Sequence, residues 1–293
     1  MKRFSIPPLI AKTQEFDGLI NHSYYDSAFR GLPPIEELRE IIHYRDLIFQ
    51  LARRDITTRY KRSALGIAWT MLNPLGMMVV LTIAFSHIFR FQTEHSYPAY
   101  VLSGLLAWNF FSQTTNAAMV NLVWGGGLLH RIYIPRTSFA LAAIITGLIN
   151  LVFALVPLLL INLITRVPIR WTLLFIPIPM VLLAAFALGV GLLISTLAVY
   201  YPDVAEMYSI VLLGWMYLTP IIYPVSILPE TIRFWIVRFN PMYYLVELYR
   251  DSVYYGRLPS LDLIIPAVLF SLFALTVGWI IFTYKADEFS YRV

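Results

Sequence analysis

Cysteine is absent from this chain of 293 residues, which leaves no disulfide framework and no metal site built on thiolates. Charged side chains are also scarce, because Asp, Glu, Lys and Arg make up 13% of the residues, against about 25% in an ordinary soluble domain. Hydrophobic residues make up 59%. This composition argues against a soluble globular protein.

The few charges are confined to short parts of the sequence. Six long stretches contain no Asp, Glu, Lys or Arg, and each is longer than the ~20 residues that an α-helix needs to cross about 30 Å of hydrocarbon. Their apolar residues lack the two-residue alternation of a transmembrane β-strand. The sequence therefore predicts an all-α polytopic membrane protein. Its transmembrane domain, residues 64–293, has six predicted helices at about 64–89, 98–123, 137–165, 172–200, 204–223 and 262–284.

Residues 1–63 form a separate segment with eleven basic and eight acidic residues. At about 35–62, apolar side chains recur every three or four positions, and basic side chains, Arg53, Arg54 and Arg59 among them, occupy much of the remaining surface. This pattern predicts an amphipathic helix in the membrane interface, with its apolar face in the acyl boundary. The alternative is an ordinary helix packed on a neighbouring soluble domain.

Basic residues also predict the orientation in the membrane. If the N-terminus is in the cytoplasm, the inner segments carry fifteen Lys and Arg residues and the outer segments seven. The positive-inside rule favours this arrangement, so we expect both termini in the cytoplasm. Basic flanks that face anionic lipid also explain the net charge of +5, and no nucleic-acid partner is expected.

The segment between the fifth and sixth predicted helices is too apolar and aromatic for a solvated loop. An Asn-Pro pair interrupts it, which predicts two short helices that cannot cross the membrane singly. We expect a re-entrant helical hairpin in the outer leaflet, where Tyr and Trp rings are favoured. The alternative is a pair of helices that lie flat on the outer surface. The residues that carry this prediction are Trp235, Asn240, Pro241, Tyr243 and Tyr244.

The sequence lacks the residues of an energy-coupling or catalytic site. No Gly-Lys pair occurs, so the chain has no P-loop for ATP. Apart from Glu206 and Asp262 at the edges of the fifth and sixth spans, the predicted spans hold no carboxylate, although an ion-coupled transporter would be expected to keep one there. Glu247 and Arg250 are three residues apart, which predicts a local ion pair. We therefore expect no catalytic residue, metal or cofactor in this chain, and any energy source in another subunit.

A short inner loop separates the second and third predicted helices. It follows three consecutive glycines at 125–127 and is partly apolar, whereas a simple connection would be polar. Apolar side chains on the cytoplasmic face predict a docking site for a soluble partner. The alternative is a loop tucked under the bundle. The predicted contact residues are Leu129, His130, Arg131, Ile132, Tyr133 and Pro135.

Several short patterns, in this order and spacing, resemble the permease subunits of type-2 ABC exporters. The nearest branch is that of the polysaccharide and polyol-phosphate exporters, which includes the O-antigen, capsule and teichoic acid permeases. The resemblance covers about residues 36–290. It rests on Leu65-Gly66-x-x-Trp69-x-x-Leu72-Asn73-Pro74, Gly104-x-x-x-Trp108-x-Phe110-Phe111, the loop ending at Pro135, Thr219-Pro220-Ile221-Ile222-Tyr223 and Asn240-Pro241-Met242.

This resemblance implies a half-transporter in a bacterial cytoplasmic (inner) membrane. Two copies would form a homodimer around a central path, with two cytoplasmic ATPase subunits that bind ATP and Mg²⁺. The assembly would export a lipid-linked glycan from the cytoplasmic side. The resemblance also gives the N-terminal helix, with Arg53, Arg54 and Arg59, a second role as a contact for the ATPase.

A sliding sugar polymer needs many shallow contacts, which aromatic rings provide. The resemblance places the first, second and fifth spans nearest the dimer axis, so we expect their aromatic and amide residues to line the path. These residues are Trp69, Asn73, Trp108, Phe110, Phe111, Tyr217 and Tyr223.

Two alternative functions remain at this stage. The first is export of small lipids or drugs by the same kind of permease. The second is a membrane-embedded glycosyl- or acyltransferase that uses the outer carboxylates Glu230, Glu247, Asp251 and Asp262.

Overall fold

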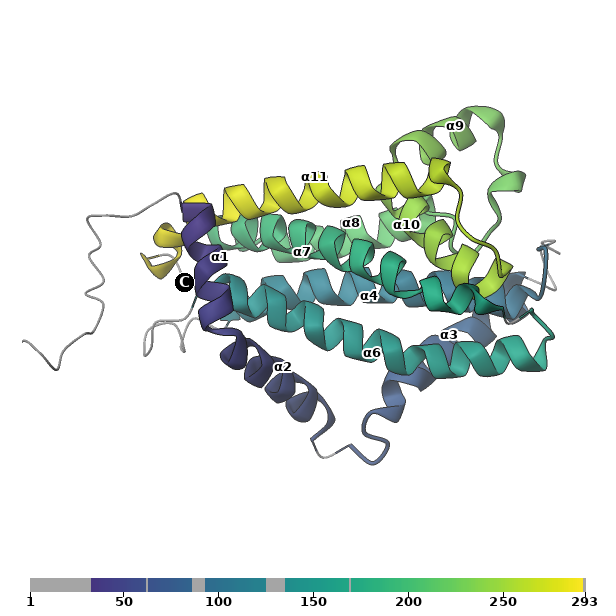
Figure 1. Ribbon diagram of the computed structural model, residues 1–293, viewed down its shortest axis with the longest axis horizontal. Coiled ribbons are helices and arrows are strands. Elements are labelled where there is room, and N and C mark those ends of the chain that lie inside the picture. Colours follow the sequence, from purple (N-terminus) through teal and green to yellow (C-terminus); the bar gives the residue numbers. More distant parts are fainter. Residues whose placement is uncertain (1–32, 62, 86–92, 125–134, 169, 292–293) are drawn as a thin grey trace, which may run out of the picture.

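The computed structural model describes residues 33–61, 63–85, 93–124, 135–168 and 170–291 (Figure 1). Within these ranges the chain forms ten α-helices and no β-strand, which confirms the all-helical class. The predicted docking residues from Leu129 to Tyr133 lie outside the described ranges.

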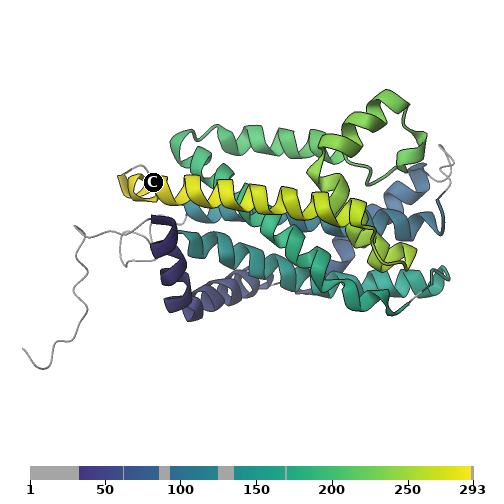
Figure 2. The ribbon, with the colours of Figure 1, turned by 45° about the horizontal axis from the view of Figure 1, so that its top comes forward.

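Four long helices lie side by side and form the body of the molecule (Figures 1 and 2). Three of them are long and apolar enough to cross a membrane. They span Thr137–Ile164, Trp171–Tyr200, where a short helix leads into the long one, and Leu261–Lys285. The fourth is as long as the first of these and contains no charged residue. The four are α4 (Tyr97–Trp124), α6 (Thr137–Ile164), α7 (Pro177–Tyr200), which follows the short helix η2 (Trp171–Phe175), and α11 (Leu261–Lys285).

Glycines bring α7 and α11 into backbone contact. A Cβ atom on Gly189 of α7 would collide with the carbonyl group of Ala274 on α11, and one on Gly278 of α11 would collide with the carbonyl group of Gly189. Small residues permit close approach of helices in membranes, where packing and not water drives association. The centre of the bundle is therefore fixed by two glycines that face each other.

Two of the six predicted spans are shorter than expected. The described part of the first is α3 (Ala68–Ala84), with 17 residues, and the fifth is α8 (Val204–Leu218), with 15 residues instead of the predicted 204–223. Pro220 explains the early end of α8, because proline disfavours the helical conformation of the preceding residue and has no N–H to donate. A count of six spans stays a prediction.

The N-terminal region forms two helices where the sequence predicted one. They are α1 (Pro33–His43) and α2 (Arg45–Tyr60), which meet at Tyr44. The apolar face of α2 differs from the prediction too, because Ile48, Leu51 and Ala52 are buried against Ala142 of α6 and do not face lipid. Ala142, with Leu141 and Ile145 beside it, forms the surface of α6 on which α2 packs. In Figure 1, α1 crosses one end of the bundle, called here the α1 end.

The opposite end carries the predicted pair of short helices, α9 (Glu230–Phe239) and α10 (Pro241–Arg250). They are interrupted at Asn240, whose side-chain Oδ1 accepts a hydrogen bond from the Met242 backbone N–H at 3.1 Å and caps α10. Trp235 of α9 is exposed, whereas α10 is almost entirely buried. The two short helices are confirmed, and their insertion into the outer leaflet stays a prediction.

Gly189→Ala should destabilise the protein by about 1–3 kcal/mol, because the added methyl meets backbone that cannot move aside cheaply. Gly191→Ala on the same helix is the matched control, since its Cβ would lie 3.2 Å from the Ala118 methyl and the helix gains propensity. Thermal unfolding of both variants in detergent tests this. Equal midpoints for the two variants would contradict the backbone contact.

Candidate functional site

A cavity of about 670 Å³ opens between α2, α3, α4 and α6. In Figure 1, α2 and α3 form a V whose two arms border the cavity, and α4 and α6 supply its floor. Polar residues make up 13 of the 23 that line the cavity, which is unusual for the inside of an apolar bundle. Its polar residues are Asp55, Thr58, Arg59, Ser63, Thr70, Asn73, Asn109, Gln113, Thr114, Asn116, Asn121, Thr146 and Asn150.

Four amide side chains in this wall have hydrogen-bonding capacity to spare. Asn109, Gln113 and Asn116 are spaced four and three residues apart on α4, so they share one face of that helix. Asn73 joins them from α3. Within the described residues none of these four side chains has a hydrogen-bond partner. All four are at least partly exposed at the surface. An amide without a partner is costly in lipid, so this cavity must hold water or a polar ligand.

The charged residues of the cavity lie at its α2 rim. The Asp55 carboxylate accepts hydrogen bonds from Arg54 Nη2 at 2.9 Å and from Asn121 Nδ2 at 3.1 Å. Arg59 is exposed near the same rim. No other charged side chain among the described residues lines the cavity, so its formal charges cancel.

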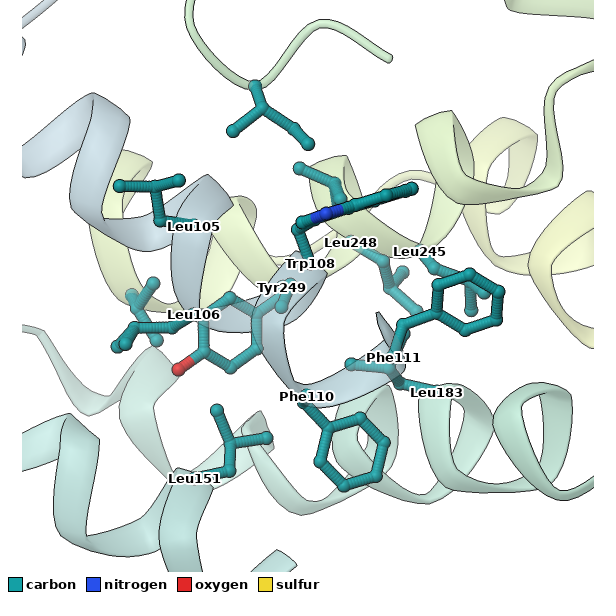
Figure 3. Close-up of a cluster of buried hydrophobic side chains, with 14 of the residues drawn as sticks. Leu105, Leu106, Trp108, Phe110, Phe111, Leu151, Leu183, Leu245, Leu248 and Tyr249 are labelled. Atoms are coloured by element: carbon teal, nitrogen blue, oxygen red, sulfur yellow. The ribbon is translucent and has the colours of Figure 1, made fainter. Parts of the chain in front are cut away.

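The residues predicted to line a path fall into different surroundings. Trp69, Asn73 and Phe110 line the cavity. Trp108 and Phe111 are 4% and 0% exposed and belong to the core (Figure 3). Figure 3 also labels Phe110 and Leu151, which belong to the same core and line the cavity as well.

The buried rings of Trp108 and Phe111 pack against the side of α8 that faces the bundle. Trp215 of α8 packs edge-on against both, with ring centroids 6.2 Å from Trp108 and 5.2 Å from Phe111. Tyr217 points away from this cluster and is 56% exposed. The Tyr223 hydroxyl donates to the Tyr217 carbonyl at 2.8 Å, so the two predicted tyrosines lie together near the end of α8.

Beyond α8, the chain runs through six non-helical residues, 219–224, called here the α8 junction. Non-helical backbone at membrane depth must find hydrogen-bond partners within the protein. Four carbonyl groups of this junction and that of Leu218 just before it do so, each with a side-chain donor from α4, α10 or the Asn240 cap. The pairs are Leu218 with Asn240 (3.4 Å), Pro220 with Arg250 (2.6 Å), Ile221 with Arg250 (2.7 Å), Ile222 with Tyr97 (2.8 Å) and Tyr223 with Tyr100 (3.0 Å).

Arg250 is the centre of this arrangement and is completely buried. Its guanidinium carbon lies 3.8 Å from the centre of the Tyr100 ring, and Nη1 donates to Glu247 Oε1 at 2.7 Å, which confirms the predicted ion pair. A Cβ atom on Gly104 would collide with Arg250 Nη2, so the glycine of the Gly104-x-x-x-Trp108 pattern makes room for the guanidinium. The spacing along the sequence predicts the ion pair of Arg250 but not its contacts with the α8 junction.

Comparison with known proteins identifies the family. The sequence profile described as the ABC-2 type transporter matches residues 46–254, well over half of the chain. This protein belongs to the ABC-2 type transporter family. A similar protein is the O-antigen export system permease protein RfbA of Myxococcus xanthus, with 28% identity over 257 residues, which cover 87% of this chain and 98% of the relative.

Two further relatives of this ABC-2 protein are named for the transport of polysialic acid and the export of capsule polysaccharide. The polysialic acid transport protein KpsM of Escherichia coli is 23% identical over 237 residues, which cover 77% of this chain and 88% of KpsM. The capsule polysaccharide export inner-membrane protein CtrC of Neisseria meningitidis is 24% identical over 231 residues, which cover 75% of this chain and 83% of CtrC.

Among the predicted contacts for a partner subunit, the structure describes Pro135 and three arginines of α2. Pro135 is buried just before α6, and the side chains of Arg53, Arg54 and Arg59 are exposed on α2. Nearby, the Glu37 carboxylate of α1 accepts a hydrogen bond from Thr137 Oγ1 at 2.7 Å. This contact ties α1 to the first residue of α6, two positions after the end of the predicted docking loop.

Arg250→Leu should lower the stability of this ABC-2 protein by about 3–5 kcal/mol, because it leaves the Glu247 carboxylate and two junction carbonyls buried without their donor. Arg233→Leu on the exposed surface of α9 is the matched control and should have little effect. The thermal midpoint of each purified variant in detergent measures the difference. A midpoint for Arg250→Leu equal to that of Arg233→Leu would contradict the role of Arg250.

Proposed function

We propose that this chain is the membrane half of an ATP-driven exporter of lipid-linked polysaccharide. Its relatives are named for the export or transport of O-antigen, polysialic acid and capsule polysaccharide. In this proposal two copies form the path, two separate ATPase subunits supply the energy, and the α1 end faces the cytoplasm of a bacterium. The carrier is an integral protein of the inner membrane.

The observation that carries the proposal is the unpartnered surface of α3 and α8. Within the described structure α3 buries only Pro74 and Met78, and α8 buries only Tyr208. α8, with 15 residues, is shorter than the ~20 residues of a free-standing span, and the described part of α3 has 17. Such helices need other protein around them more than a long apolar helix does, so we place a second copy of the chain against them.

A glycine on the exposed surface of α8 supports a helix contact there. A Cβ atom on Gly214 would meet no other atom within 4 Å, so nothing inside one copy requires a glycine at this position. Leu213 and Tyr217 lie next to it on the exposed surface. Because small residues let membrane helices approach each other, Gly214 marks the place where α8 meets its symmetry mate or the moving substrate.

The proposed path has an aromatic wall with a rigid backing. Tyr217 and Tyr223 from the end of α8 face the path, whereas Trp69 and Asn73 from α3 line the cavity beside it. Trp108 and Phe111 act behind this wall, since they hold Trp215 of α8 in place. Phe110 belongs to the cavity between α4 and α6. The predicted residues therefore fall into those that face the path, those that line the cavity and those that pack behind α8.

A single cysteine at Tyr217 should give a covalent homodimer on mild oxidation or with a short bifunctional maleimide. The chain has no cysteine of its own, so each introduced thiol is the only one present. Leu272→Cys is the matched control, because Leu272 is 51% exposed on α11 and lies outside the proposed interface. The measurement is the amount of covalent dimer that each variant forms in native membranes, read on denaturing gels. Cross-linking at Leu272 but not at Tyr217 would place the interface on the wrong helix.

Ile132→Ser with Tyr133→Ser should weaken docking of the ATPase subunit about tenfold or more. Burial of one such side chain is worth roughly 1.5–3 kcal/mol, and each 1.4 kcal/mol is about tenfold in affinity. Co-purification and the stimulated ATPase rate are the measurements. Phe234→Ser, on the exposed surface of α9 at the opposite end, should change neither and serves as the control. An unaltered ATPase rate in the double variant would refute the docking role.

A further inference from the structure

The cavity between α2, α3, α4 and α6 has a wall chemistry that selects one class of ligand. Each amide offers two N–H donors and a carbonyl acceptor, the same combination that pairs of sugar hydroxyls require. Asn109, Gln113 and Asn116 present this set from one face of α4, and Asn73 adds to it from α3. All four lack hydrogen-bond partners within the described chain.

The same wall is unsuited to an anionic group in its interior. Desolvation of an anion is expensive unless cationic donors replace its water. The cationic side chain that lines the cavity, Arg59, lies at the α2 rim, where Asp55 also contributes a negative charge. The interior among the described residues of α3, α4 and α6 contains uncharged side chains alone. Neutral groups are therefore favoured there.

The shape of the cavity agrees with a small ring as its ligand. Its volume of about 670 Å³ falls in the range of sites that enclose a small molecule, about 300–1,000 Å³. Trp69, 52% exposed, stands in the wall and offers the face of an indole ring. Such a ring packs against the apolar C–H face of a sugar while its N–H stays available for a hydroxyl.

We propose that this cavity is a binding site, within each copy of the chain, for an uncharged sugar ring at the lipid-linked end of the glycan. The ring enters from the membrane between the arms of the V formed by α2 and α3. This inference rests on the proposed function and deepens it, because it adds a site apart from the path between two copies. It assigns the neutral part of the substrate to the cavity and leaves any phosphate outside, at the α2 rim.

A single cysteine at Val120 tests the site without removing any amide. Val120 is 38% exposed and lines the cavity. The variant is placed in phosphatidylcholine nanodiscs, and the rate of maleimide labelling is measured with dodecyl maltoside or dodecyl phosphate, each below its micelle-forming concentration. The maltoside should slow labelling about fivefold, the effect of roughly one net hydrogen bond, and the phosphate should not. Thr276→Cys, on the exposed surface of α11, should be labelled at one rate throughout.

A second variant separates sugar recognition from binding of the alkyl chain. Asn109→Leu with Asn116→Leu, added to the Val120→Cys background, should abolish the protection by dodecyl maltoside and leave the thermal midpoint near that of the parent. Equal protection by both amphiphiles, protection by the phosphate alone, or no protection by either would each overturn the proposal. ATP-driven export and cross-linking at Tyr217 do not depend on this result, so a failure here is distinguishable from a failure of the proposed function.

Discussion

Backbone carbonyl groups cannot go unpaired at membrane depth, and the α8 junction is where this constraint acts most strongly on the chain. The helix ends at Leu218 because Pro220 follows, and the next carbonyl groups lose the partners that a continuing helix would have supplied. Arg250 replaces two of those partners, and Tyr97, Tyr100 and Asn240 replace the others. The positions of α4, α8 and α10 at this end are linked through these bonds.

The need to pair these carbonyl groups also explains why α8 can form a wall of the proposed path. Its far end is held by charged and phenolic donors, and its middle is supported by Trp215 on the rings of Trp108 and Phe111. In the proposed assembly, the remaining exposed surface of α8 contacts a second copy and the substrate. Gly104 contributes to this arrangement, because a larger residue would displace the Arg250 guanidinium that holds the α8 junction. A wall anchored at one end and open along its length suits a path through which a long polymer slides.

Much of the architecture could be predicted from the sequence, because uncharged length is a strong local signal. The third, fourth and sixth predicted spans, the interruption at Asn240 and the Glu247–Arg250 pair depend on spacing along the chain, and the structure has each of them. The site was less predictable. The face shared by Asn109, Gln113 and Asn116 is visible in the spacing, but its meeting with α2 and α3 around a cavity is not.

The differences between expectation and structure have tertiary causes. The apolar face of α2 looked suited to lipid, yet Leu141, Ala142 and Ile145 of α6 cover it. Arg250 looked like a loop charge because its donors serve carbonyl groups 29 and 30 residues away, which no local pattern reveals. Trp108 and Phe111 look the same in sequence as path residues, and only the position of Trp215 assigns them to support.

The most direct test of the central claim is transport in proteoliposomes that contain a lipid-linked polysaccharide and either this chain alone or this chain with its ATPase subunit. Exposure of the glycan on the opposite leaflet is read with a membrane-impermeant lectin. We predict exposure that requires both subunits together with ATP and Mg²⁺, and none with this chain alone under a proton or sodium gradient. Translocation by this chain alone under such a gradient, or sugar transfer in place of translocation, would contradict the account.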